Sequence, residues 1–314
     1  MQSETSSQPA PETDFLAAPS RSRWGRLTKL LAFAVVAYAL VCGALVLWET
    51  RLVFPGAYFD ANPWMDQSRF NPDQPQFGEV VSFDYQSIDD QTLSGRFFER
   101  EDASRVILFL HGNGIRAVDM DGWARRLSDA FDANVLVAEY RGYQEPGFDP
   151  SEQSTFDDAI AAIDALSAAT NTPVENILVY GRSLGGGIAA GLVEALTDRG
   201  TPPKSLVLDR TFDSVADVGA DMFWFLPVRF LIKNRFDSIQ HLQSYRGNVV
   251  QIHGTPDRIV PMKNGRRLHD HLATPTKVWI EVPDMRHNDR ISLKSLQQVN
   301  DELELLEANS HRES

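Results

Sequence analysis

A serine flanked by glycines directly after a short apolar run is the feature that most limits how this chain can fold. The apolar run covers residues 177–180 (ILVY), and GRSLG follows at 181–185. A serine on a sharp strand-to-helix turn needs glycine two residues before and after it, because a Cβ atom there would collide with neighbouring backbone. Residues 186–196 then have the apolar and small side chains of a helix packed on a sheet. The sequence therefore predicts a strand, a turn that presents Ser183, and a buried helix.

A second turn lies upstream, where the predicted buried strand 106–110 (VILFL) leads into HGNG at 111–114. The oxyanion that forms during attack on a carbonyl group is stabilised by two backbone N–H groups. One follows the nucleophile, and the other lies in a loop after an earlier strand. We expect the N–H groups of Leu184 and Asn113 to take these roles, with Gly114 as the alternative to Asn113.

Two further strand-to-loop segments supply an acid and a base. The apolar segment 249–252 (VVQI) leads into a loop with Asp257, and the segment 277–282 (KVWIEV) leads into a loop with His287. The chain order Ser183, Asp257, His287 is the order found in α/β serine hydrolases, and it differs from the order in the other serine-hydrolase folds. These three residues are the predicted catalytic triad.

Other carboxylates and histidines compete for these roles. Asp209, at the end of the predicted strand 205–208, and Asp289 are the alternative acids. The remaining histidines are interpreted as structural or exposed: His111, His241, His253, His269, His271 and His311. His269 and His271 are two residues apart on a predicted helix and point to different faces, which makes a poor metal pair. We expect neither a metal nor a cofactor.

With these motifs, the chain resembles the α/β-hydrolase superfamily, and within it the Bem46 and ABHD12/13/17-like membrane-anchored serine hydrolases. The resemblance covers about residues 52–305. It also rests on Leu52-Val53-Phe54-Pro55, Glu139-Tyr140-Arg141-Gly142-Tyr143, Pro150-Ser151-Glu152 and Asn234-Arg235-Phe236-Asp237-Ser238. The chain departs from the family pattern at Gln144 and at Met285-Arg286, which we expect near the mouth of the pocket.

The resemblance implies an α/β-hydrolase fold, with a mostly parallel, doubly wound sheet and one preceding transmembrane helix. It implies hydrolysis of carboxylic esters or thioesters, including those of lipids, through an acyl-enzyme on Ser183. His287 would take the proton of the serine, and Asp257 would orient the imidazole. An acyltransferase with the same triad and a catalytically silent scaffold are the alternatives.

An uncharged run from Leu30 to Trp48 predicts a membrane-spanning helix over residues 27–48. At about 1.5 Å per residue, such a run reaches nearly the 30 Å of a bilayer's hydrocarbon core. A cleaved signal peptide is disfavoured by this length and by the lack of a small-x-small cleavage site. The basic residues before the run are Arg21, Arg23, Arg26 and Lys29. They predict a cytoplasmic N-terminus and a hydrolase domain on the non-cytoplasmic side. The sequence has a single cysteine, Cys42, and no N-glycosylation sequon, which fits a bacterial periplasm.

The rest of the chain divides around this helix. We expect a disordered tail over 1–26, rich in Ser and Pro, a juxtamembrane linker over 49–77, one hydrolase domain over 78–308 and a tail over 309–314. Within the domain, alternating residues at 79–85 and 92–99 predict an antiparallel edge pair. The net charge of −13 argues against nucleic acid as a partner.

Two aromatic segments stay open. Residues 221–232 (DMFWFLPVRFLI) are either a helix packed on the core or a lid whose aromatic residues receive an acyl chain or rest on the membrane. A second group, Phe54, Tyr58, Phe59 and Trp64, either packs on the domain or lies at the membrane interface.

Overall fold

The computed structural model describes residues 23–59, 80–88, 90–144 and 147–313. These residues form two compact units, one ending at Ala44 and one beginning at Leu45. The predicted tail up to residue 22 and the linker residues 60–77 lie outside the described residues, as does Trp64. The first unit consists of the helical residues 23–44, and the second contains the sheet and every predicted site residue.

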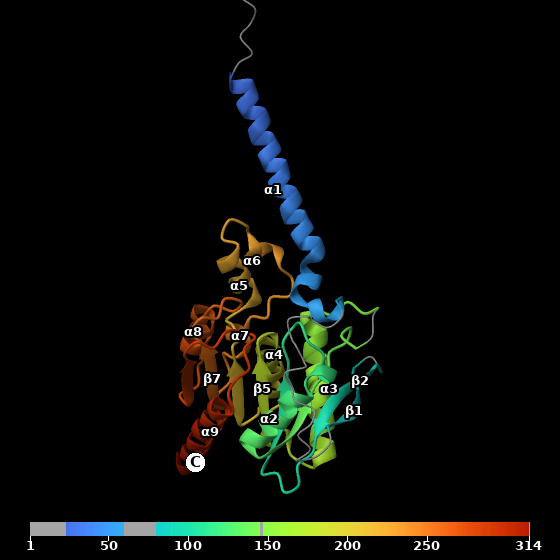
Figure 1. The fold of residues 1–314 in the computed structure, drawn as a ribbon, viewed down its shortest axis with the longest axis vertical. Helices are drawn as coiled ribbons and strands as arrows, with labels where there is room; N and C mark the ends of the chain where they lie inside the picture. Colours follow the sequence, from blue (N-terminus) through green and yellow to red (C-terminus); the bar gives the residue numbers. More distant parts are fainter. Residues whose placement is uncertain (1–22, 60–79, 89, 145–146, 314) are drawn as a thin grey trace, which may run out of the picture. The chain divides into compact units, whose positions relative to one another are not determined.

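Within the described residues, the second unit is built around an eight-stranded sheet with the order β1-β2-β4-β3-β5-β6-β7-β8 (Figure 1). The strands are β1 (Val80–Gln86), β2 (Thr92–Phe98), β3 (Arg105–Leu110), β4 (Ala133–Val137), β5 (Ile177–Arg182), β6 (Ser205–Asp209), β7 (Asn248–Gly254) and β8 (Lys277–Val282). The pairs β1–β2 and β2–β4 are antiparallel, and the other neighbouring strands are parallel. The predicted mostly parallel sheet and its antiparallel edge pair are confirmed.

Helices cover both faces of this sheet (Figure 1). The helices are α1 (Arg23–Val53), α2 (Asp121–Phe131), α3 (Glu152–Thr170), α4 (Leu184–Asp198), α5 (Val215–Met222), α6 (Val228–Leu231), α7 (Ser238–His241), α8 (Met262–His271) and α9 (Leu293–Glu313), with short 3-10 turns η1 (Pro55–Ala57), η3 (Ala117–Asp119) and η4 (Val174–Asn176). Two buried apolar clusters lie between the helices and the sheet. One packs α3, α4 and α8 against the sheet, and the other packs α2 and α9 against it. This arrangement explains why the central strands read as continuous apolar runs.

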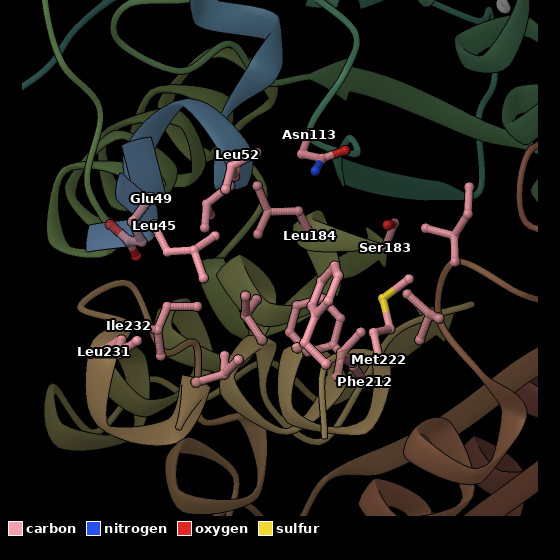
Figure 2. A pocket seen from close by; sticks show the side chains of 18 residues that line it. Leu45, Glu49, Leu52, Asn113, Ser183, Leu184, Phe212, Met222, Leu231 and Ile232 are labelled. Atoms are coloured by element: carbon pink, nitrogen blue, oxygen red, sulfur yellow. The ribbon is translucent and has the colours of Figure 1, made fainter. Parts of the chain in front are cut away.

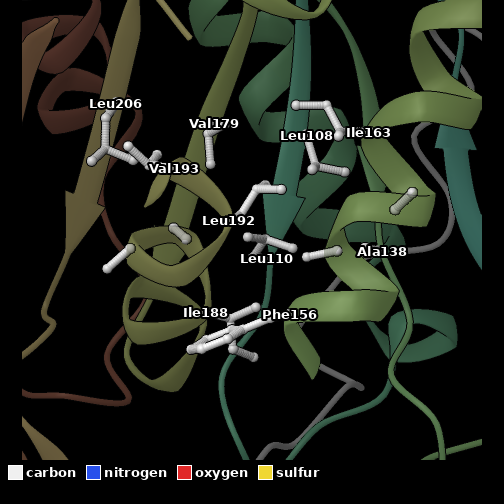
Figure 3. Close-up of a cluster of buried hydrophobic side chains, with 14 of the residues drawn as sticks. Leu108, Leu110, Ala138, Phe156, Ile163, Val179, Ile188, Leu192, Val193 and Leu206 are labelled. Atoms are coloured by element: carbon white, nitrogen blue, oxygen red, sulfur yellow. The ribbon is translucent and has the colours of Figure 1, made fainter. Parts of the chain in front are cut away.

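Figure 3 shows the first of these clusters between the sheet and two helices. Leu108 of β3 faces Ile163 of α3 and Leu192 of α4, and all three side chains are fully buried. Burying a side chain of this size contributes about 1.5–3 kcal/mol relative to exposing it. The packed layers hold the carboxyl ends of the parallel strands at one edge of the sheet, where the predicted site residues follow β3, β5, β7 and β8.

The helix that contains the predicted membrane span is longer than expected. It begins at Arg23 and ends at Val53, and residues 25–53 are long and apolar enough to cross a membrane. Its last turns belong to the second unit, which therefore begins at residue 45 and not at the predicted residue 78. The physical reason is packing, because Glu49 and Phe54 are buried in this unit.

The other end of the chain is also more ordered than predicted. Helix α9 continues through the expected tail to Glu313. The hydroxyl of Ser310 donates to the Asn248 side-chain oxygen at 3.0 Å, which ties the last turns of α9 to the start of β7.

Candidate active site

Ser183 lies on a tight turn between β5 and α4. Its φ of 54° and ψ of −120° are strained for a residue with a side chain. A Cβ atom on Gly181 would approach the Gly185 oxygen to 2.5 Å, and one on Gly185 would overlap the Leu110 backbone. The turn is held because the Ser183 N–H donates to the Asp209 carbonyl at 2.9 Å. The sequence locally folds this way because only glycine fits on both sides of the serine.

The structure brings Ser183, His287 and Asp257 together from three separate loops. Nε2 of His287 lies 2.8 Å from Oγ of Ser183, and Nδ1 of His287 lies 2.7 Å from Oδ2 of Asp257. The other carboxylate oxygen of Asp257 accepts hydrogen bonds at 2.9 Å from the N–H groups of Ile259 and Val260. These bonds orient the carboxylate toward the imidazole, so a serine hydroxyl, an imidazole and a carboxylate form one continuous hydrogen-bonded chain.

The two alternative acids are engaged elsewhere. The Asp209 carboxylate accepts two hydrogen bonds from the Arg210 guanidinium, at 2.7 and 3.0 Å. Oδ2 of Asp289 accepts from the Arg286 N–H at 2.8 Å, which closes the turn around His287. Geometry therefore singles out Asp257 as the carboxylate that contacts His287.

Two buried arginines hold the loop of His287, and sequence reasoning missed both. Arg182 donates to the His287 carbonyl at 3.1 Å, and Arg210 donates to the same carbonyl at 2.9 Å and to the Asp289 carbonyl at 2.7 Å. Arg182 also lies over the Trp123 ring, 5.2 Å from its centroid. The signal was present in the sequence: Arg182 directly precedes the serine, and Arg210 directly follows a predicted strand.

The electrostatics of the site favour a neutral imidazole. Burial lowers the pKa of His287 below its ordinary value of 6.5; the hydrogen bond to Asp257 opposes this shift, and Arg182 and Arg210 reinforce it. Burial, followed by repulsion from Arg210, lowers the pKa of Arg182 to about 10. A neutral histidine beside a serine hydroxyl is the protonation state that a general base requires.

The two predicted oxyanion donors flank the serine. Leu184 is the first residue of α4, and Asn113 lies in the loop after β3. Within the part of the chain that the structure describes, neither backbone N–H donates to a protein acceptor. The Asn113 carbonyl, by contrast, accepts from the Gly56 N–H at 2.9 Å and from the Tyr143 hydroxyl at 3.0 Å. Asn113 and Leu184 line the same pocket as Ser183.

An apolar pocket of about 280 Å³ opens beside Ser183. Figure 2 shows Leu45 and Leu52 of α1 on one side of it, and Met222 at the end of α5 on another, with Ser183 and Asn113 at its polar end. Residues 221–232, whose role was left open, form α6 and the end of α5, and several of their side chains line this pocket. Their other aromatics are exposed, with Trp224 at 84% and Phe230 at 90%.

The residues that depart from the family pattern do not line this pocket, contrary to expectation. The Gln144 side chain accepts from the Ser94 N–H at 2.9 Å, at the edge strand β2. Met285 is buried in the apolar cluster under α9, and Arg286 contributes only backbone contacts to the His287 loop.

Other histidines of this region have structural partners. His111 is fully buried, with Nδ1 at 2.9 Å from the Gly112 carbonyl and Nε2 at 3.3 Å from Glu139. Nε2 of His253 lies 2.9 Å from the Val260 carbonyl. Among the described residues, no group of three or more His, Cys, Asp or Glu side chains is arranged to hold a metal ion.

Sequence comparisons connect this chain to hydrolases over part of its length. It is 38% identical over 156 residues to an uncharacterised Mycobacterium tuberculosis protein, covering 50% of this chain and 53% of that protein. It is 28% identical to the Arabidopsis thaliana α/β hydrolase domain-containing protein WAV2, covering 59% of this chain and 64% of the relative. The zebrafish (Danio rerio) lysophosphatidylserine lipase ABHD12 is also 28% identical, with 60% and 52% covered. The chain therefore spans about half to two thirds of these relatives, and no family model matches it.

A solved structure agrees with this result at the level of the fold. The α/β hydrolase from Vibrio vulnificus superposes with a TM-score of 0.63 at 18% identity, covering 82% of this chain and 92% of that chain. The strand order, the turn at Ser183 and these similarities all indicate the same fold. The chain has the α/β-hydrolase fold, and the relatives that it matches include a named α/β hydrolase.

Proposed function

We propose that this protein is a serine hydrolase that cleaves carboxylic esters or thioesters. The observation that carries the proposal is the hydrogen-bonded chain of Ser183, His287 and Asp257 at the polar end of an apolar pocket. Oγ of Ser183 attacks the carbonyl carbon, and Nε2 of His287 takes the serine proton. Asp257 holds the imidazole in the required orientation and stabilises its positive charge.

The reaction proceeds in two balanced steps. The tetrahedral oxyanion accepts hydrogen bonds from the N–H groups of Leu184 and Asn113, which we propose as the oxyanion hole. Collapse of this intermediate expels the alcohol or thiol, which takes the proton from His287. Water then attacks the acyl group on Ser183, gives a proton to His287, and releases the carboxylic acid and the free serine. Removing one oxyanion donor typically lowers kcat by about 10²–10³-fold.

The acyl part of a lipid is the substrate group that this pocket suits. Its lining is apolar apart from a few groups near Ser183 and the carboxylate of Glu49. Glu49 accepts hydrogen bonds from the Asn234 side chain at 2.9 and 3.1 Å, so both oxygens of this carboxylate have a partner. The name of the zebrafish relative, a lysophosphatidylserine lipase, supports a lipid ester.

Residues 27–48 are proposed to anchor the enzyme in a membrane. The apolar helix over residues 25–53 supports a single span. The basic residues before it favour a cytoplasmic N-terminus, with the hydrolase domain on the opposite, periplasmic side. The substrate would then be taken from the same membrane that holds the enzyme.

Labelling with a fluorophosphonate probe tests the proposal, because this probe reacts with an activated serine. We expect the detergent-solubilised wild type to be labelled and Ser183→Ala to be unlabelled, with at least a thousandfold loss of esterase turnover. The matched control is Ser82→Ala, at an exposed position on the edge strand β1, which should behave as wild type. Folded wild type that resists labelling would instead favour a catalytically silent scaffold. Product analysis with an added alcohol separates hydrolysis from acyl transfer.

A further inference from the structure

The backbone of the proposed oxyanion residue Asn113 is held from outside its own loop. Its carbonyl accepts two hydrogen bonds, from the Gly56 N–H at 2.9 Å and from the Tyr143 hydroxyl at 3.0 Å. The carbonyl of Asn113 shares a rigid peptide plane with the N–H of Gly114, and it is attached to the same residue as the Asn113 N–H. Whichever of the two N–H groups meets the oxyanion, holding this carbonyl orients the donor.

Gly56 approaches this loop so closely that no larger residue fits. A Cβ atom there would lie 2.5 Å from Cε1 of Tyr143 and 3.0 Å from the Asn113 oxygen. The first neighbour belongs to the residue whose hydroxyl holds the Asn113 carbonyl, and the second is the oxygen of that carbonyl. Adding a single methyl group at Gly56 must therefore displace the Tyr143 ring, the Asn113 carbonyl or the turn itself.

The turn that carries Gly56 is firmly attached to the hydrolase unit. Phe54 is fully buried, and its ring meets the Phe236 ring edge-on at a centroid distance of 5.9 Å. The Phe54 N–H donates to the Thr50 carbonyl at 2.8 Å, so the turn continues directly from the last turn of α1. Pro55 then opens the short turn η1, in which the Ala57 N–H bonds back to Phe54.

The end of α1 is clamped to the same unit one turn earlier. The Glu49 carboxylate accepts from both the N–H and the side chain of Asn234, and the Asn234 oxygen accepts from the Glu152 N–H at 2.7 Å. Glu152 in turn accepts from the N–H groups of Arg235 and Phe236. These contacts tie the end of α1, and with it the turn at Gly56, to the start of α3.

We infer that Gly56 is a positioning residue of the oxyanion hole, and that the turn after the apolar helix is part of the catalytic machinery as well as a connection to the anchor. This inference rests on the proposed serine hydrolase function. Gly56 touches no reacting atom; it acts through Asn113, whose N–H, or that of Gly114, receives the developing charge. Tyr143 is the second support of the same carbonyl.

The test measures kcat and KM of the full-length, detergent-solubilised protein with a short soluble ester. We expect Gly56→Ala to lower kcat about ten- to a hundredfold, because a displaced donor loses part of the 10²–10³-fold effect of an oxyanion contact. Tyr143→Phe, which removes one hydrogen bond and adds no atoms, should lower kcat about three- to tenfold. In both variants KM should stay within threefold, and the pH at half-maximal activity should not move, because the Ser183–His287 pair is untouched.

The matched control is Gly43→Ala, which adds the same methyl group to α1 at a position with nothing within 4 Å. It should leave kcat at the wild-type value, and Ser183→Ala is measured beside it. Serine-dependent turnover with wild-type kcat in Gly56→Ala and Tyr143→Phe overturns the inference and leaves the proposed function standing. Turnover that survives Ser183→Ala overturns both. If Gly56→Ala fails to fold, the kcat of Tyr143→Phe alone tests the inference. A three- to tenfold rise of KM in Tyr143→Phe with unchanged kcat would overturn it and indicate a role in substrate binding.

Discussion

Asp209, Asp257 and Asp289 show how neighbouring residues decide the role of a carboxylate. All three lie in loops or strand ends near His287, and their residue type is the same. Arg210 pairs with Asp209, and the Arg286 N–H donates to Asp289. Two backbone N–H groups orient Asp257 toward the imidazole. Arg210 is held in turn by its buried ion pair with Asp209, and removing one partner of such a pair costs about 3–5 kcal/mol. Because Arg210 also donates to the His287 carbonyl, this pair helps to fix the loop of His287.

The pKa of His287 leads to a prediction at this scale. Only the neutral imidazole accepts the proton of Ser183, so activity is lost when pH falls through the pKa of His287. Burial lowers that pKa below 6.5, so kcat/KM for a soluble ester should rise with pH to a half-maximum below 6.5 and be flat near pH 7. His269→Asn is the control, because burial lowers the pKa of His269 to about 4 outside the site, and its profile should match wild type. A half-maximum above 6.5 would contradict this role of His287.

At the scale of elements, α5 and α6 shape the pocket more than the sheet does. Val218 and Met222 of α5 and Leu231 of α6 line the cavity, and the exposed aromatics lie on the same short segment. The segment is therefore neither a plain core helix nor a free surface loop. It is a cap with one face toward the cavity, and Lys233 and Asn234, which follow it in the chain, donate backbone hydrogen bonds to Glu49 of α1.

A larger side chain in this cap should change acyl-chain preference. Val218→Phe fills part of the cavity, so we expect at least a tenfold loss of kcat/KM for long-chain esters and less than a threefold loss for acetate or butyrate esters. Val118→Phe makes the same substitution at an exposed position outside the pocket and should change neither value. Equal losses for all chain lengths would show that this cavity does not hold the acyl chain.

At the scale of the whole molecule, the apolar helix and the catalytic unit share residues 45–53. The proposed topology predicts that alkaline phosphatase, fused after Ser314 in a bacterial host, is active because it reaches the periplasm. The same reporter fused before Met1 should be inactive, since Arg21, Arg26 and Lys29 keep that end in the cytoplasm. The reverse pattern of activities would mean that the hydrolase domain faces the cytoplasm.

The sequence by itself determined the local features. Glycine spacing around Ser183 predicts a strained turn, and apolar runs predict the strands β3, β5, β6, β7 and β8, because sterics and burial act within a few residues. Chain order was enough to propose Ser183, Asp257 and His287, which the structure brings into hydrogen-bond distance.

Only the tertiary structure decided which distant groups meet. The clamp of Glu49 on Asn234, the support of Asn113 by Gly56, and the hold of Arg182 and Arg210 on the His287 loop join residues far apart in the chain. No periodicity or spacing encodes such contacts, because they depend on how whole layers pack. For the same reason, the end of α1 looked like a linker in the sequence but is a wall of the pocket in the fold.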